Sequence, residues 1–144
     1  MAPLRPILVA EPRRPRGIID TSVVIDLDKL DPIDLPAELA VSAITMAELA
    51  AGPHVTDDGA ERGRRQDRLQ RAEAGFDPLP FDGEAARAYG RIYAAVSAGG
   101  GKARGARAVD LLIAAIAVCL HLPLYTRNGD DFRSLEDLLD VISV

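Results

Sequence analysis

The sequence has very little of what a disulfide-bonded, membrane-spanning or base-stacking protein needs. Its single cysteine, Cys119, excludes an internal disulfide bond and fits a reducing compartment. Aromatic residues make up only 4% of the chain and tryptophan is absent, which argues against a surface that stacks single-stranded bases. The longest apolar stretch, residues 109–124, is interrupted by Asp110, His121 and Pro123 and is too short to cross a bilayer. No apolar signal segment opens the chain, so we expect a cytoplasmic protein with no membrane partner.

Positive charge is also scarce, which gives no support to a nucleic-acid partner. The formal net charge is −5, and the first 16 residues carry four arginines against one glutamate, so that the remainder is still more acidic. Nucleic acid would have to meet such a chain at a site where metal ions reverse the local sign of charge. With 144 residues and 48% hydrophobic content, the chain is large enough for one compact domain with a core.

The order of apolar and helical segments predicts the architecture. Residues 1–16 contain four prolines and are expected to form a flexible extension ahead of a domain at 17–144. Strands are predicted at 17–19, 39–44, 77–81, 122–126 and 138–144. Helices are predicted at 22–28, 45–52, 57–75, 83–98 and 108–120, with a turn or short helix at 131–135. This alternation is typical of an α/β fold, in which a central parallel sheet of about four to five strands has helices on both faces.

Four acidic residues lie where a parallel sheet places its functional site. Asp20 ends the first predicted strand, Glu48 lies one turn into the helix after the second, Asp110 opens the buried helix and Asp131 follows the fourth strand. Ligands bind outside the carboxyl ends of the strands in open sheets of this kind. Four carboxylates gathered there repel one another unless cations are bound, and oxygen ligands favour Mg2+ or Mn2+ over Zn2+. An all-carboxylate metal pair suits the hydrolysis of phosphodiester bonds.

Each of these acids also has a purely structural explanation. Asp20 could cap the helix that follows it, and Asp110 could favour the positive end of its own helix. Thr45-x-x-Glu48 fits a capping box, in which Glu48 would reach back to the Thr45 N–H. Asp131, or its neighbour, could cap the turn after the fourth strand. These explanations suffice for one acid at a time, but they do not explain why four acids meet at one edge of the sheet.

The four acids belong to four short motifs, which are residues 18–25 (IIDTSVVI), 42–49 (SAITMAEL), 108–115 (AVDLLIAA) and 126–132 (TRNGDDF). With these motifs in this order and spacing, residues 17–144 resemble the PIN-domain family, and within it the VapC toxins of VapBC toxin–antitoxin pairs. The resemblance implies a PIN-like α/β/α sandwich with the activity of a Mg2+- or Mn2+-dependent endoribonuclease, using one or two ions per active site. It also implies a homodimer, inhibited by a VapB-type antitoxin whose tail covers the acidic site and through which alone the toxin meets DNA.

The resemblance assigns roles residue by residue. Asp20, Glu48 and Asp110 match the first three acids of the family, and Asp131 is chosen over Asp130 as the fourth because it directly precedes Phe132. Further side chains are expected to orient the carboxylates or the waters, namely Thr21, Ser22, Thr126 and Asn128. Phosphate contacts are expected from arginines near the motifs, namely Arg104, Arg107 and Arg127, unless these are ordinary surface arginines.

Other functions that use acids at strand ends lack a required part. A phosphoaspartate receiver needs a lysine near the end of the domain, and the only lysines are Lys29 and Lys102. An aspartate-nucleophile phosphatase needs a second acid two residues after Asp20, where the chain has Ser22. The alternative that stays open is a non-catalytic PIN-like scaffold that binds RNA or protein. In either case the 83–98 helix and the 57–75 arm are expected to contact the second subunit and the antitoxin, and the sequence does not specify which RNA is bound.

Overall fold

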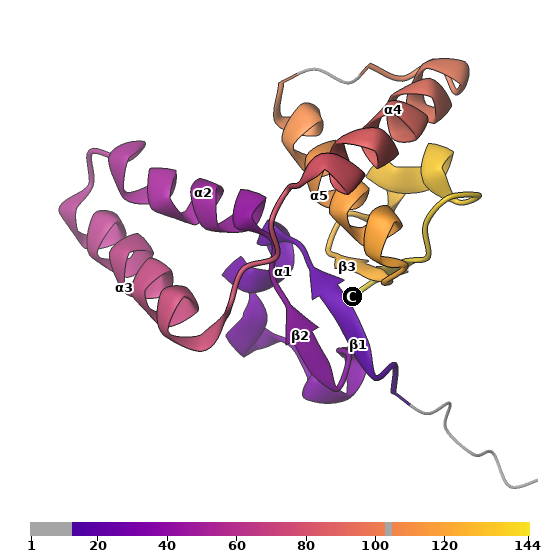
Figure 1. The fold of residues 1–144 in the computed structure, drawn as a ribbon. Coiled ribbons are helices and arrows are strands. Elements are labelled where there is room, and N and C mark those ends of the chain that lie inside the picture. The colour runs from indigo at the N-terminus through magenta and orange to yellow at the C-terminus, as the bar shows by residue number, and fades with distance from the viewer. Residues whose placement is uncertain (1–12, 103–104) are drawn as a thin grey trace, which may run out of the picture.

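The computed structural model describes residues 13–102 and 105–144 (Figure 1). Most of the expected flexible extension at 1–16 therefore lies outside the described residues. Its last residues contact the domain: the Arg13 guanidinium donates to the carbonyl oxygens of Leu35 and Pro36, and Arg14 pairs with Asp140. The first strand begins at Arg16, one residue ahead of the expected start of the domain.

A parallel sheet of four strands lies at the centre of the fold. The strands are β1 (Arg16–Ile19), β2 (Glu38–Ala40), β3 (Leu124–Thr126) and β4 (Val141–Ser143), in the order β2-β1-β3-β4. Ile18 pairs with Ala40 on one side and with Leu124 on the other, and every pairing is parallel. This confirms the predicted sheet. The strand expected at 77–81 is reduced to a single bridge between Leu79 and Ser42.

Helices connect the strands and cover both faces of the sheet. They are α1 (Thr21–Ile25), α2 (Ala43–Ala51), α3 (Gly59–Gly75), α4 (Gly83–Ala98) and α5 (Ala106–Leu120). Short 3-10 turns complete the chain at η1 (Leu27–Lys29), η2 (Pro32–Asp34), η3 (Gly52–His54) and η4 (Gly129–Leu135). In Figure 1, α2 and α3 form a hairpin on one side of the sheet, while α4 and α5 pack together on the other.

Alternation along the strands sends neighbouring side chains into two separate cores. Ile18 and Leu124 point into the core beneath α4 and α5, where residues 113–117 of α5 are completely buried. Ile19 and Tyr125 point into the opposite core, with side chains from α1, α2 and α3. This three-layer arrangement is the predicted α/β/α sandwich. No helix in the described ranges is both long and apolar enough to cross a membrane.

Candidate active site

Asp20 stands at the carboxyl end of β1, and its side chain is only 4% exposed. Its backbone N–H donates to the Tyr125 carbonyl, which fixes the residue at the edge of the sheet. Its Oδ1 accepts hydrogen bonds from the Val23 N–H at 3.1 Å and from the Ser22 hydroxyl at 2.6 Å. The capping explanation is therefore correct for Asp20, but both bonds end on the same oxygen. Capping α1 and binding a ligand through Oδ2 are compatible.

Ser22 also connects this acid to the segment that follows β3. Its hydroxyl accepts a hydrogen bond from the Arg127 N–H at 3.0 Å while it donates to Asp20. The hydrogen bond from Ser22 to Asp20 is consistent with the orienting role predicted for Ser22. Two other predicted orienting residues act on the turn rather than on an acid: the Thr126 hydroxyl accepts from the Asn128 N–H, and the Asn128 carbonyl accepts from the Asp131 N–H.

Glu48 is held by Thr21 rather than by a capping box. Helix α2 begins at Ala43, and its cap is Ser42, whose hydroxyl accepts from the Thr45 N–H at 3.0 Å. The predicted helix start at Thr45 is therefore wrong, and the alternative explanation of Glu48 by a capping box is excluded, because Ser42 supplies the cap three residues earlier. Glu48 is free of that role, and its Oε1 accepts a hydrogen bond from the Thr21 hydroxyl at 2.5 Å.

Three hydroxyl groups form a relay behind Glu48. The Thr21 and Thr45 oxygens are 3.0 Å apart, and those of Thr45 and Ser42 are 3.4 Å apart. A hydroxyl has one proton, so Thr21, which donates to the Glu48 carboxylate, accepts from Thr45, and Thr45 accepts from Ser42. Ser42 and Thr45 are completely buried. Neither residue was predicted from the sequence as part of the site, although Ser42-x-x-Thr45 was readable as a cap.

Asp110 lies in the second turn of α5, because the helix begins at Ala106. The prediction that Asp110 opens this helix is wrong, and so is its explanation by the helix N-terminus, whose first turn contains no acid. Burial, as the largest cause, and the negative charges of Asp20, Glu48 and Asp131 together raise the pKa of Asp110 to about 6. These three acids therefore lie close enough to Asp110 to oppose its ionisation. Helix α5 leads back into β3, which places its first half over the carboxyl ends of the strands.

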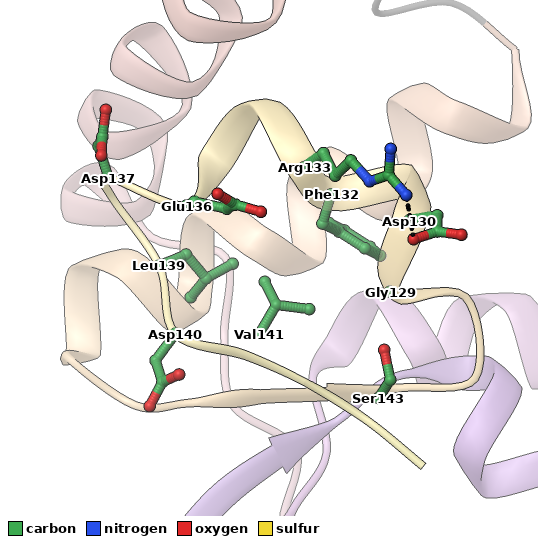
Figure 2. A pocket seen from close by; sticks show the side chains of 10 residues that line it. All are labelled: Gly129, Asp130, Phe132, Arg133, Glu136, Asp137, Leu139, Asp140, Val141 and Ser143. Atoms are coloured by element: carbon green, nitrogen blue, oxygen red, sulfur yellow. Dashed lines mark hydrogen bonds and ion pairs between the residues drawn. The ribbon is translucent and has the colours of Figure 1, made fainter.

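The pKa of Asp110 also distinguishes Asp131 from Asp130 as the fourth acid. Asp131 acts on the pKa of Asp110, whereas Asp130 is not among the charges that do so. Asp130 instead pairs with Arg133 at 3.0 Å on the rim of a cavity of about 630 Å³ between η4 and β4 (Figure 2). That cavity is larger than the hollow of about 330 Å³ beside Glu48, but its charged rim consists mainly of carboxylates and includes none of the four predicted acids.

The four acids are electrostatically coupled without forming a closed coordination shell. Within residues 13–102 and 105–144, no three side chains of His, Cys, Asp or Glu lie close enough to hold one metal ion between them. Among the described residues, Arg107 is the cation whose charge opposes that of the carboxylates at Asp110. The donor set nevertheless consists of oxygen atoms from four sides, which is the chemistry that Mg2+ and Mn2+ require.

The predicted phosphate-binding arginines differ in position. Arg107 lowers the pKa of Asp110, so it faces the acids, and its Nε is buried with no hydrogen-bond partner among the described residues. The Arg127 Nε lies 3.6 Å from an Asp26 carboxylate oxygen beside α1. Arg104 lies outside the described residues. The two histidines, His54 and His121, are exposed and end helical segments.

Comparison with known proteins gives consistent results across sequence and structure. Residues 18–138 match the sequence model of the PIN domain. The chain is 34% identical to ribonuclease VapC5 of Mycobacterium tuberculosis over 87% of its own length and 91% of that protein. It is 31% identical to ribonuclease VapC of Rickettsia bellii over 88% of its length and 95% of that protein. Among solved structures it is similar to the VapBC-5 toxin–antitoxin system of M. tuberculosis, with a TM-score of 0.79 and 32% identity over 90% of this chain and 99% of that one.

Proposed function

Because the chain belongs to the PIN-domain family, and within it to the VapC group, we propose that it is a Mg2+-dependent endoribonuclease that acts as the toxin of a type II toxin–antitoxin pair. The observation that carries this proposal is the position of Asp110, a partly buried carboxyl group whose pKa is raised by burial and by the charges of Asp20, Glu48 and Asp131. A fold keeps such an unfavourable cluster where its charge is used. A non-catalytic scaffold has no need of it.

Each acid has a distinct part in the proposed site. Asp20 and Asp110 would hold the divalent ion directly, Asp20 through the oxygen that does not cap α1. Glu48, aimed by Thr21, and Asp131 would complete the site from α2 and η4. Mg2+ or Mn2+, as one ion or two, would supply charge neutralisation for the phosphate and acidify the attacking water. Arg107, whose charge acts on Asp110, is the described arginine best placed to contact the scissile phosphate.

The experiment is cleavage of a structured RNA by the purified protein with Mg2+ and with EDTA. Asp20→Asn and Asp110→Asn are the matched variants, because each removes one negative charge at constant size. We expect Mg2+-dependent cleavage by the wild type and a loss of at least about a hundredfold in each variant. Equal cleavage by wild type and variants would indicate a contaminating nuclease. Absence of Mg2+-dependent cleavage of any RNA would favour the scaffold.

The proposal extends to partners. Several similar solved structures are toxin–antitoxin complexes, and those of Rickettsia felis and Salmonella typhimurium are bound to DNA. We infer that a VapB-type antitoxin covers the acidic site of this chain, that DNA is met only through the antitoxin, and that the protein acts in the cytoplasm.

We also infer a homodimer, for which the half-exposed Tyr93 of α4, whose ring lies at an angle to that of Tyr89, offers apolar surface. Sedimentation of the purified toxin as a monomer at micromolar concentration would contradict the dimer.

A further inference from the structure

A groove runs between α1–η1 and the second half of α3, next to the acid cluster. It has a volume of about 450 Å³, and its walls include the apolar Leu27 and Phe76 and the charged Arg68 and Arg71. A second hollow of about 330 Å³ is lined by Thr21 and Glu48 of the proposed active site, and Arg68 borders this hollow as well. The groove and the hollow beside Glu48 therefore adjoin, with Arg68 in the wall of both.

The arginines of α3 fall into two groups. Arg62, Arg64 and Arg65 are engaged: Arg62 donates to backbone carbonyls of the η3 region, and both of the others pair with Glu61. Arg68 and Arg71 have no hydrogen bond or ion pair among the described residues. They stand three residues apart, on neighbouring positions of one helix face. The groove thus presents two guanidinium groups whose donors are not used within the described protein.

Acidic side chains of the groove do not cancel these two arginines. Asp26 and Asp28 line the wall formed by α1 and η1. Asp26 lies 3.7 Å from the Lys29 ammonium group and 3.6 Å from the Arg127 guanidinium group. Lys29 and Arg127 therefore neutralise the charge of Asp26 without help from Arg68 or Arg71. Only Asp28 is left as an opposing charge among the lining residues that the structure describes.

Resting on the proposed ribonuclease function, we propose that this α1–α3 groove binds the RNA strand on one side of the cleaved bond, with Arg68 and Arg71 contacting its phosphates. The acid cluster repels phosphate, so an RNA strand needs cationic contacts just beyond it. Guanidinium groups bind phosphate oxygens through two parallel hydrogen bonds. The apolar wall fits one unstacked base, in the way that proteins hold single-stranded RNA. The two unengaged guanidinium groups, one of them in the wall of the hollow beside Glu48, favour the phosphates of the substrate over a separate protein segment as the occupant.

The test is RNA binding by the double variant Arg68→Gln/Arg71→Gln. Binding of a fluorescein-labelled single-stranded RNA of mixed sequence would be measured by anisotropy in EDTA, over a range of salt concentrations. The matched control is Arg87→Gln/Arg91→Gln, which removes the same charge from α4, on the opposite face of the sheet. We expect about tenfold weaker binding for each groove arginine removed, and a slope of log affinity against log salt that is shallower by about 0.7 for each. The control should bind RNA nearly as the wild type does.

Cleavage assays keep this proposal separate from the proposed function. With Mg2+, the groove variant should raise KM for RNA far more than it lowers kcat, because phosphate contacts outside the bond that breaks act on binding. Thermal unfolding should confirm that both double variants are folded. Equal RNA affinity and equal salt slope in the groove variant and the wild type would overturn the groove, even if wild-type cleavage is normal. A groove variant that binds RNA normally but forms no complex with a co-expressed antitoxin would also overturn the proposal. The groove would then bind the protein partner and not RNA. Absence of cleavage by the wild type would instead contradict the proposed function.

Discussion

Asp110 is a carboxyl group that the fold makes harder to ionise. Its partial burial and, after that, three neighbouring carboxylates raise its pKa from 3.8 to about 6. The folded protein therefore retains a proton there that the unfolded chain releases. Above the folded pKa the group is ionised in both states, and its full electrostatic cost reduces stability. The proposed cation would remove this cost, which explains how an acid cluster of this kind persists.

Asp110→Asn should consequently stabilise the protein in EDTA. A shift of about two pH units corresponds to at most about 3 kcal/mol, and partial exposure to solvent reduces this to roughly 1–2 kcal/mol. The gain should be complete above about pH 6 and disappear as the pH falls towards about 4, where Asp110 is protonated in both states. Urea unfolding at several pH values measures it, with the exposed Asp67→Asn as control. A gain that does not change with pH, or a loss at about pH 7.5, would contradict the coupling.

Thr21 offers a second test at the scale of single residues. Its hydroxyl donates to Glu48 at 2.5 Å, so Thr21→Val should leave this carboxylate unaimed and Thr21→Ser should retain the bond. Loss of a residue that orients a metal ligand typically lowers metal affinity by about tenfold to a hundredfold. Calorimetric titration with Mn2+ should therefore rank the wild type and the serine variant above the valine variant. Equal affinities for valine and serine would mean that Thr21 only packs against α2.

At the scale of elements, the sequence predicted what each segment is better than where it begins. The helix predicted at 83–98 has the same bounds as α4, but its buried face consists of Ala85, Ala88, Ile92 and Val96, whereas Tyr93 of the periodic apolar pattern is exposed. The start of α2 was misplaced because both Ser42 and Thr45 are good caps. Only the bridge between Ser42 and Leu79, which the sequence does not show, indicates that Ser42 is the cap that the tertiary structure uses. The strand predicted around Leu79 is a single bridge in the structure. Its length depends on how far it pairs with the segment that follows β2, which the sequence does not show.

Close packing in β1 can be tested by two glycine substitutions. A Cβ placed on Gly17 would lie 2.6 Å from the Tyr125 ring, which is buried and cannot move aside. Gly17→Ala should therefore destabilise the fold by about 1–3 kcal/mol through overpacking. Gly63 in α3 has open space around it, so Gly63→Ala should stabilise the fold by about 0.5–1 kcal/mol through helix propensity. Urea unfolding of both variants measures the contrast. Equal effects of the same sign would contradict the close contact between β1 and β3.

At the scale of the whole molecule, the parallel sheet brings together residues that are far apart in the sequence. Asp20, Glu48, Asp110 and Asp131 come from four elements, and their convergence could be predicted because strand ends meet at one edge of such a sheet. Asp131 could be preferred over Asp130 from the sequence only through its neighbour Phe132, and the electrostatic contact with Asp110 supports that choice. The α1–α3 groove was not predicted. Nothing in the spacing of Arg68 and Arg71 shows that α3 folds back beside α1.

The overall charge of the molecule bears on how it could attract RNA. A chain with a net charge of −5 does not attract RNA as a whole, so attraction must be local. The proposed cation at the acid cluster and the unengaged arginines of α3 supply it in adjoining places. RNA binding should accordingly weaken steeply with salt, even though the protein is acidic.

The central claim, that four acids form one metal site, is tested most directly by Mn2+ titration of single amide variants. Asp20→Asn, Glu48→Gln, Asp110→Asn and Asp131→Asn should each lower Mn2+ affinity by at least about tenfold. Asp130→Asn, which changes the adjacent and equally charged residue, should bind Mn2+ as the wild type does, because Asp130 pairs with Arg133 away from the cluster. A wild-type protein that binds no Mn2+, or an Asp131→Asn variant indistinguishable from Asp130→Asn, would contradict the account.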